Sequence, residues 1–200
     1  MPARVIVLAG PSGSGKSRLS RRLGLPVVNL DDFYKDGDDP TLPVLDLAGG
    51  DPIVDWDHPG SWLLEDAVAT LEKLCTGGWA EIPVYDIARS TRVGHRVLEL
   101  GGDGHFVAEG IFAQHVVAPC RERDLLADAV CLARFPPLTF ALRLARDLRE
   151  HRKPPWVLVR RGLHLMRRER ALVGEAAALG CRVLGMQRAH AELRAAAGPT

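Results

Sequence analysis

Apolar residues occur along the chain in short continuous runs separated by longer amphipathic stretches. The first run, Val5 to Ala9, is closed by Gly10, which is typical of a parallel strand buried on both faces. Four further runs predict strands at Pro26 to Leu30, His105 to Ala108, Asp128 to Ala133 and Cys181 to Leu184. Helices are predicted at Lys16 to Leu23, Ser61 to Cys75 with Ser61 as N-cap, Pro137 to Arg152, Trp156 to Leu179 and Arg188 to Ala197. This alternation indicates an α/β fold with a parallel sheet of about five strands flanked by helices.

Two segments do not follow the alternation of strand and helix. Asp32 to Gly60 is rich in aspartate and interrupted by prolines, and it reads as a long functional loop. Trp79 to Leu100 contains two short β-like pieces, Ala80 to Tyr85 and Arg96 to Leu100, which predict a hairpin insert on the substrate side.

The composition is that of a globular protein and narrows the possible function classes. With 200 residues, the chain is expected to form one domain over residues 1–200. A net charge of +1 gives no general attraction to nucleic acid or to an anionic membrane. The N-terminal apolar run is too short for a signal peptide or a membrane span, and the four cysteines show no paired spacing. We therefore expect a cytoplasmic protein that binds neither membranes nor nucleic acid.

A glycine-rich motif lies between the first predicted strand and the first predicted helix. It matches G-x-x-x-x-G-K-[ST] in full, which predicts the P-loop NTPase fold with ATP and magnesium as ligands. Glycines let the backbone N–H groups turn toward phosphate oxygens, the lysine reaches the β and γ phosphates, and the serine hydroxyl binds Mg²⁺. The predicted ATP-binding residues are Gly10, Pro11, Ser12, Gly13, Ser14, Gly15, Lys16, Ser17 and Arg18.

Two carboxylates follow predicted strands at the edge of the sheet where ligands bind. Asp31 comes after the second strand, and there it can accept a proton from an attacking hydroxyl group or hold the metal through water. Glu109 comes after the third strand and precedes Gly110, so it is a candidate magnesium partner of Ser17. Both could instead be turn residues, but their positions near the loop favour function.

Several motifs follow one another along the first three quarters of the chain. They are Gly10 to Ser17, Asp31-Asp32-Phe33-Tyr34, Asp55-Trp56-Asp57-His58-Pro59, Pro83-Val84-Tyr85-Asp86 with Arg92, Glu109-Gly110-Ile111, and Arg143 with Arg146-Asp147. In this order they resemble the uridine kinase family. Relatives of that family include nicotinamide riboside kinase, pantothenate kinase and phosphoribulokinase.

The resemblance implies a role for each matching residue. Asp31 corresponds to the catalytic carboxylate, and Lys16 and Arg146 would act with it on the transferred phosphate. Tyr34 and Asp57 would line the ribose site, Tyr85 would lie near the nucleobase, and Arg92 would belong to the same pocket. Glu109 would be the acid near magnesium, while Arg143 and Arg146 would lie on the helix whose arginines approach the phosphates.

The chain departs from the uridine kinase pattern where that pattern contacts the base. Ile87 and Ser90 stand where a phenylalanine and a histidine are usual. The chain is therefore predicted either to tolerate changes in the group attached to the sugar or to have a non-pyrimidine substrate, while still requiring a polyol with a free primary hydroxyl group. The basic run Arg134 to Arg170 is interpreted in its first half as a lid over the phosphates, and in its second half as a charged helix face.

The sequence thus predicts an ATP-dependent kinase that phosphorylates a primary hydroxyl group of a small, nucleoside-like molecule. A related metabolite kinase, acting on nicotinamide riboside, pantothenate or a sugar, is the nearest alternative. Asp46-Leu47-Ala48-Gly49 fits the D-x-x-G pattern of a nucleotide-switch protein, and the basic run would suit a nucleic-acid-binding ATPase; both are weaker readings. The oligomeric state stays open, with a homo-oligomer as one option.

Overall fold

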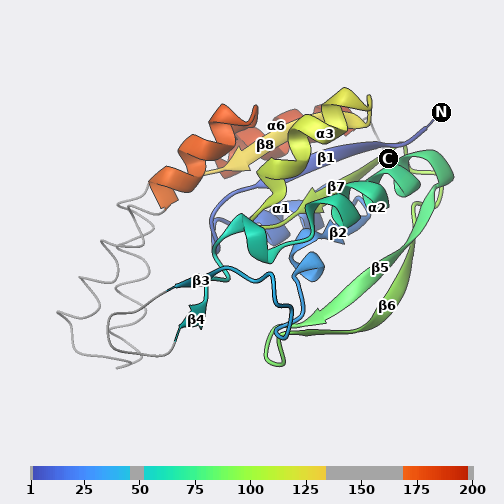
Figure 1. Ribbon diagram of the computed structural model, residues 1–200. Coiled ribbons are helices and arrows are strands. Elements are labelled where there is room, and N and C mark those ends of the chain that lie inside the picture. Colours follow the sequence, from blue (N-terminus) through green and yellow to red (C-terminus); the bar gives the residue numbers. More distant parts are fainter. Residues whose placement is uncertain (1, 46–51, 134–168, 198–200) are drawn as a thin grey trace, which may run out of the picture.

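Five parallel strands form the centre of the molecule (Figure 1). The computed structural model describes residues 2–45, 52–133 and 169–197. The strands are β1 (Arg4–Ala9), β2 (Val27–Asn29), β7 (His105–Glu109), β8 (Leu126–Leu132) and β9 (Arg182–Leu184), in the spatial order β2-β7-β1-β8-β9. All four strand pairings are parallel. The predicted α/β P-loop NTPase fold is confirmed.

The central strand β1 is buried on both faces because its apolar run serves two separate cores. Val5 and Val7 belong to the core beneath α2 (Leu64–Gly77) and α3 (Val117–Glu122). Ile6 and Leu8 belong to the core beneath α1 (Lys16–Leu23) and α6 (Met186–Ala197). Successive side chains of a strand point to opposite faces, so a continuous apolar run is what a sheet covered by helices on both sides requires.

The predicted helices that fall within the described residues are present with some shifts at their ends, whereas the six-residue helix α3 was not predicted. Helix α1 has the predicted bounds, whereas α6 begins two residues earlier than predicted, at Met186. Residues 169–178 are helical, in agreement with the end of the predicted helix Trp156 to Leu179. The predicted helix Pro137 to Arg152 lies outside the described residues, as do residues 134–168 in general.

Ser61 was wrongly predicted to cap the second helix. Helix α2 begins at Leu64, and its N-cap residue, Leu63, makes no side-chain cap bond. Ser61 instead ends the 3-10 helix η2 (Pro59–Ser61), where its hydroxyl donates to the carbonyl oxygen of His58 at 2.7 Å. The hydroxyl is already used within the preceding turn, so the helix starts three residues later.

The two segments outside the alternation hold more structure than the sequence suggested. The predicted insert is a long antiparallel hairpin of β5 (Trp79–Asp86) and β6 (Thr91–Glu99), which packs beside α2 (Figure 1). The acidic segment contains the 3-10 helix η1 (Leu30–Phe33) and two very short antiparallel strands, β3 (Val44–Leu45) and β4 (Ile53–Val54). These short strands have no alternating pattern, which explains why the sequence read as a loop.

None of the helices in the described ranges is both long and apolar enough to cross a lipid bilayer.

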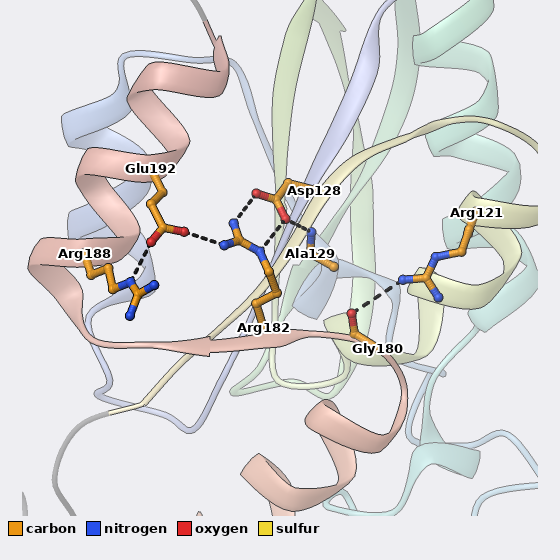
Figure 2. A network of polar contacts seen from close by, with 7 residues as sticks. All are labelled: Arg121, Asp128, Ala129, Gly180, Arg182, Arg188 and Glu192. Carbon is orange, nitrogen blue, oxygen red and sulfur yellow. Dashed lines mark hydrogen bonds and ion pairs between the residues drawn. The ribbon is translucent and has the colours of Figure 1, made fainter.

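A network of ion pairs fastens the last strand and helix to the sheet (Figure 2). The Arg182 guanidinium, on β9, donates to both carboxylate oxygens of Asp128 on β8, at 3.2 and 2.6 Å. It also donates to Glu192 on α6, and Arg188 donates to the other oxygen of Glu192 at 2.6 Å. Arg182 therefore joins a short edge strand to two neighbouring elements.

We expect Arg182→Ala to lower stability moderately without changing the active site. The bidentate geometry favours a real contribution, but the side chain is 46% exposed, so water and salt screen it. The expected loss is about 1 kcal/mol, which corresponds to a drop in Tm of about 2–4 °C for a chain of this size. Thermal unfolding at low and high salt measures it. Arg194→Ala, at an exposed position on α6, is the control, and equal effects of both changes would refute the role of the network.

Candidate active site

The glycine-rich motif forms a turn between β1 and α1 that only glycine can follow. Gly10, Gly13 and Gly15 have φ angles of 136°, 80° and 105°. A Cβ atom on Gly10 would lie 2.6 Å from the carbonyl oxygen of Leu132, closer than real Cβ contacts come. The loop thus runs against β8 and leads directly into the N-terminus of α1, where backbone N–H groups and the helix dipole favour an anion. This geometry fits the phosphates of ATP.

Lys16 lies folded across the loop. Its Nζ donates to the carbonyl oxygens of Gly10, at 2.6 Å, and of Pro11, at 3.4 Å. Burial lowers the pKa of Lys16, and the nearby carboxylates of Asp31 and Glu109 oppose that shift. The lysine is therefore a half-buried cation held by weak neutral acceptors, and phosphate oxygens would be stronger partners for it.

Asp31 lies in η1, just beyond the end of β2. Its Oδ1 accepts a hydrogen bond from the backbone N–H of Ile111 at 2.8 Å. A Cβ atom on Gly110 would lie 2.9 Å from that oxygen, so the glycine after Glu109 makes room for the carboxylate. Burial raises the pKa of Asp31, while the Ile111 N–H and Lys16 work against the rise. A carboxylate with a raised pKa is a better proton acceptor than an exposed aspartate.

Glu109 ends β7 and is almost fully buried. Its Oε2 accepts a hydrogen bond from the Ser20 hydroxyl at 2.6 Å. With Ser17 and Asp31 it supplies oxygen ligands, the kind that Mg²⁺ prefers. The described residues contain no cluster of three His, Cys, Asp or Glu side chains that could hold a metal alone. The donor set therefore fits magnesium bound jointly by one or two side chains, phosphates and water.

These groups face a single cavity of about 630 Å³ at the carboxyl ends of the strands. Of the residues that the sequence singled out for the site, it is lined by Ser12, Gly13, Gly15, Lys16, Ser17, Arg18, Asp31, Tyr34, Tyr85 and Glu109. Ile87 and Ser90, where the chain departs from the uridine kinase pattern, line it as well. The structure thus brings the loop, both carboxylates and the hairpin insert around one space.

Three aromatic rings form part of the wall of this cavity. The ring centroid of Tyr34 lies 5.8 Å from those of Trp56 and Tyr85. The Tyr34 hydroxyl donates to the carbonyl oxygen of Trp56 at 3.2 Å, and the Tyr85 hydroxyl donates to that of Lys35 at 2.9 Å. The phenols are thus fixed by the backbone, and the rings give this part of the cavity an aromatic lining.

Other predicted site residues lie outside this cavity. Asp57 lines a neighbouring cavity of about 580 Å³, which shares Ser12 and Ile111 with the first. Arg92 lies on the far side of the hairpin, where its guanidinium pairs with Asp36 at 3.2 Å. The predicted lid, with Arg143 and Arg146, lies outside the described residues, and so does the Asp46-Leu47-Ala48-Gly49 motif.

Sequence reasoning overlooked some residues of the site. Trp56 and Asn29 line the main cavity, and Arg21 lines it beside Arg18. Trp56 could have been found from its place beside Asp57 in a matched motif. Ser20 carried no signal, because its contact with Glu109 joins residues far apart in the chain.

Comparisons with known proteins show similarity to uridine kinases. No model of a known protein family matches the chain. A uridine kinase from Lactobacillus johnsonii is 27% identical over 154 residues, which is 73% of this chain and 68% of that protein. A uridine kinase from Streptococcus thermophilus is 24% identical over 159 residues, or 75% of this chain and 71% of that protein.

A further similarity concerns only part of a much longer protein. An inorganic pyrophosphatase from Arabidopsis thaliana is 31% identical over 115 residues, which is 54% of this chain. The match spans only 16% of the pyrophosphatase, so the activity of that whole protein is not transferred to this chain.

Similarity to a solved structure supports the fold. A protein from Silicibacter sp., provisionally described as a fructose transport system kinase, superposes with a TM-score of 0.59 over 86% of this chain and 85% of that one. At 19% sequence identity, this similarity shows the architecture alone. Together these comparisons show a chain that is similar to uridine kinases over about three quarters of its sequence and that shares the fold of a kinase structure.

Proposed function

We propose that this kinase transfers the γ-phosphate of ATP, with magnesium, to a primary hydroxyl group of a small nucleoside-like molecule. The observation that carries the proposal is the single cavity in which Asp31 faces the phosphate-binding loop and a wall of aromatic rings. A hydroxyl group bound next to Asp31 would lie in the same cavity as a phosphate held by the loop. This is the arrangement that phosphoryl transfer needs, because its catalysis depends mainly on positioning and charge.

Each group in the cavity has a separate task in this mechanism. The loop N–H groups and Lys16 would bind the β and γ phosphates, and Ser17 and Glu109 would hold magnesium, which neutralises the phosphate charge. The Ile111 N–H fixes one oxygen of Asp31, and the other oxygen can accept the proton of the acceptor hydroxyl. The aromatic wall would orient the acceptor and exclude water from one side.

The identity of the acceptor depends on the part of the cavity furthest from the loop. Tyr34, Trp56 and Tyr85 offer ring faces, which bind any flat ring without reading its edge. Ile87 has no side-chain donor or acceptor, and Ser90 can serve as either. We infer an enzyme that demands a hydroxyl-bearing sugar or polyol and is permissive toward the group attached to it. Nicotinamide riboside, pantothenate and sugars are therefore alternative acceptors to uridine.

A coupled phosphorylation assay across uridine, cytidine, nicotinamide riboside, pantothenate and simple sugars tests this proposal. We expect kcat/KM values for the nucleosides to lie within about two orders of magnitude of each other, because a site that reads a base by buried hydrogen bonds rejects others by about four orders. Ser90→Ala should change these ratios little. A preference of four orders for uridine and cytidine would contradict permissive recognition, and no phosphorylation of any acceptor would contradict the function.

A further inference from the structure

A buried hydrogen bond joins the helix after the phosphate-binding loop to the acid at the end of β7. The hydroxyl of Ser20, on α1, donates to Glu109 Oε2 at 2.6 Å. Ser20 is 1% exposed and Glu109 is 8% exposed, so water has little access to this contact. A hydrogen bond to a carboxylate with so little water around it is among the stronger ones in proteins.

This contact is more than the usual bond of a helical hydroxyl to its own helix. Thr70 and Thr76 on α2 show the usual case, with hydroxyls 2.8 and 2.9 Å from the carbonyl oxygens four residues before them. The Ser20 hydroxyl lies 3.1 Å from the corresponding carbonyl oxygen, of Lys16, and 2.6 Å from the carboxylate. A hydroxyl has one hydrogen to donate, and the shorter distance to a charged acceptor assigns it to Glu109.

The consequence is that only one oxygen of Glu109 is fixed. Oε2 is held by Ser20, while Oε1 makes no hydrogen bond with any of the described residues, and Glu109 lines the cavity beside Lys16 and Ser17. Asp31 is held in the same way, with one oxygen bonded to the Ile111 N–H. Each carboxylate thus has one oxygen fixed by the protein and one available to the cavity.

We propose that Ser20 is a positioning residue, which holds the Glu109 carboxylate so that its second oxygen faces the magnesium ion of bound MgATP. The proposal rests on the proposed function, because it takes Glu109 as the acid near magnesium. Without the hydroxyl, Glu109 can turn toward the Lys16 ammonium group, to which it is attracted. Both side chains would then be drawn away from the metal and the phosphates.

The test measures ATP binding by calorimetry over a series of Mg²⁺ concentrations, with no acceptor present. Ser20→Ala is expected to raise the Mg²⁺ concentration for half-maximal ATP binding by about 10–100-fold, the usual effect of losing a group that orients a metal ligand. ATP binding in the presence of a chelator should not change. Ser20→Cys, which keeps the size but is a weak donor, should behave like Ser20→Ala. Ser20→Thr, which keeps the hydroxyl, should restore most of the Mg²⁺ affinity.

Two controls separate positioning from a merely structural role. Thr70→Ala removes a helical hydroxyl far from the loop and should leave the Mg²⁺ dependence unchanged. Glu109→Gln should raise the Mg²⁺ requirement at least as much as Ser20→Ala. A folded Ser20→Ala or Ser20→Cys with a lower Tm and a normal Mg²⁺ dependence would overturn the proposal, as would a normal Mg²⁺ dependence in Glu109→Gln. If Ser20→Ala shifts the Mg²⁺ dependence of ATP binding but none of the tested acceptors is phosphorylated, only the proposed class of acceptor is refuted.

Discussion

Lys16→Ala is expected to lower kcat by about two to three orders of magnitude while the protein stays folded, since removing one preorganised group that stabilises transition-state charge costs about 10²–10³-fold. Lys16 is also the residue of the phosphate-binding loop that would place a full positive charge next to the phosphates. Among the described residues its Nζ donates to the carbonyl oxygens of Gly10 and Pro11, and burial lowers its pKa. Removing it therefore takes no strong partner from the fold.

Steady-state kinetics and circular dichroism of the same preparation measure both parts of this prediction. Arg22→Ala is the matched control, because Arg22 is an exposed cation on the same helix that does not line the cavity. It should keep near-normal turnover. Turnover close to normal in Lys16→Ala would mean that the loop does not bind the transferred phosphate.

Asp31→Asn is expected to lower kcat by about two orders of magnitude or more, the range associated with the loss of a positioned base. The amide oxygen of asparagine can still accept the Ile111 N–H, so the side chain should keep its place and ATP binding should persist. Because burial raises the pKa of Asp31, the ionised form is disfavoured in the folded protein. Stability contributed by this site falls as the pH rises through the raised pKa, so the uncharged variant should have an equal or higher Tm at neutral pH.

Comparison of kcat, ATP affinity and Tm for Asp31→Asn and Asp32→Asn checks this prediction. Asp32 is next in the sequence but does not line the cavity, so its substitution should have a much smaller effect on kcat. In the native enzyme, kcat/KM should fall as the pH is lowered and Asp31 becomes protonated. Because the pKa of Asp31 is raised, this fall should occur at a higher pH than for an aspartate with an ordinary pKa. A larger loss in Asp32→Asn than in Asp31→Asn would show that Asp32 is the base.

Site residues could be predicted where the sequence pattern that marks them lies next to them in the chain. Asp31 and Glu109 were found because they directly follow buried strands, and in a parallel sheet these strand ends meet at one edge. Asp57 and Arg92 were assigned to the acceptor pocket by resemblance alone, and the structure places them beside the cavity and behind the hairpin. A bulge between Val84 and Tyr85 shifts the register there, and no sequence pattern marks it.

By itself, the sequence determined the parallel sheet, the loop between β1 and α1, and the hairpin insert. Each rests on a local rule: continuous apolar runs for strands buried on both faces, glycines for the positive φ angles of the loop, and two neighbouring β-like pieces for the hairpin. Only the tertiary structure decided that Ser61 is used before α2 begins, and that Ser20 holds Glu109 across 89 residues. Such contacts depend on which side chains meet after the chain has folded, because a hydroxyl bonds to whichever acceptor lies nearest in space.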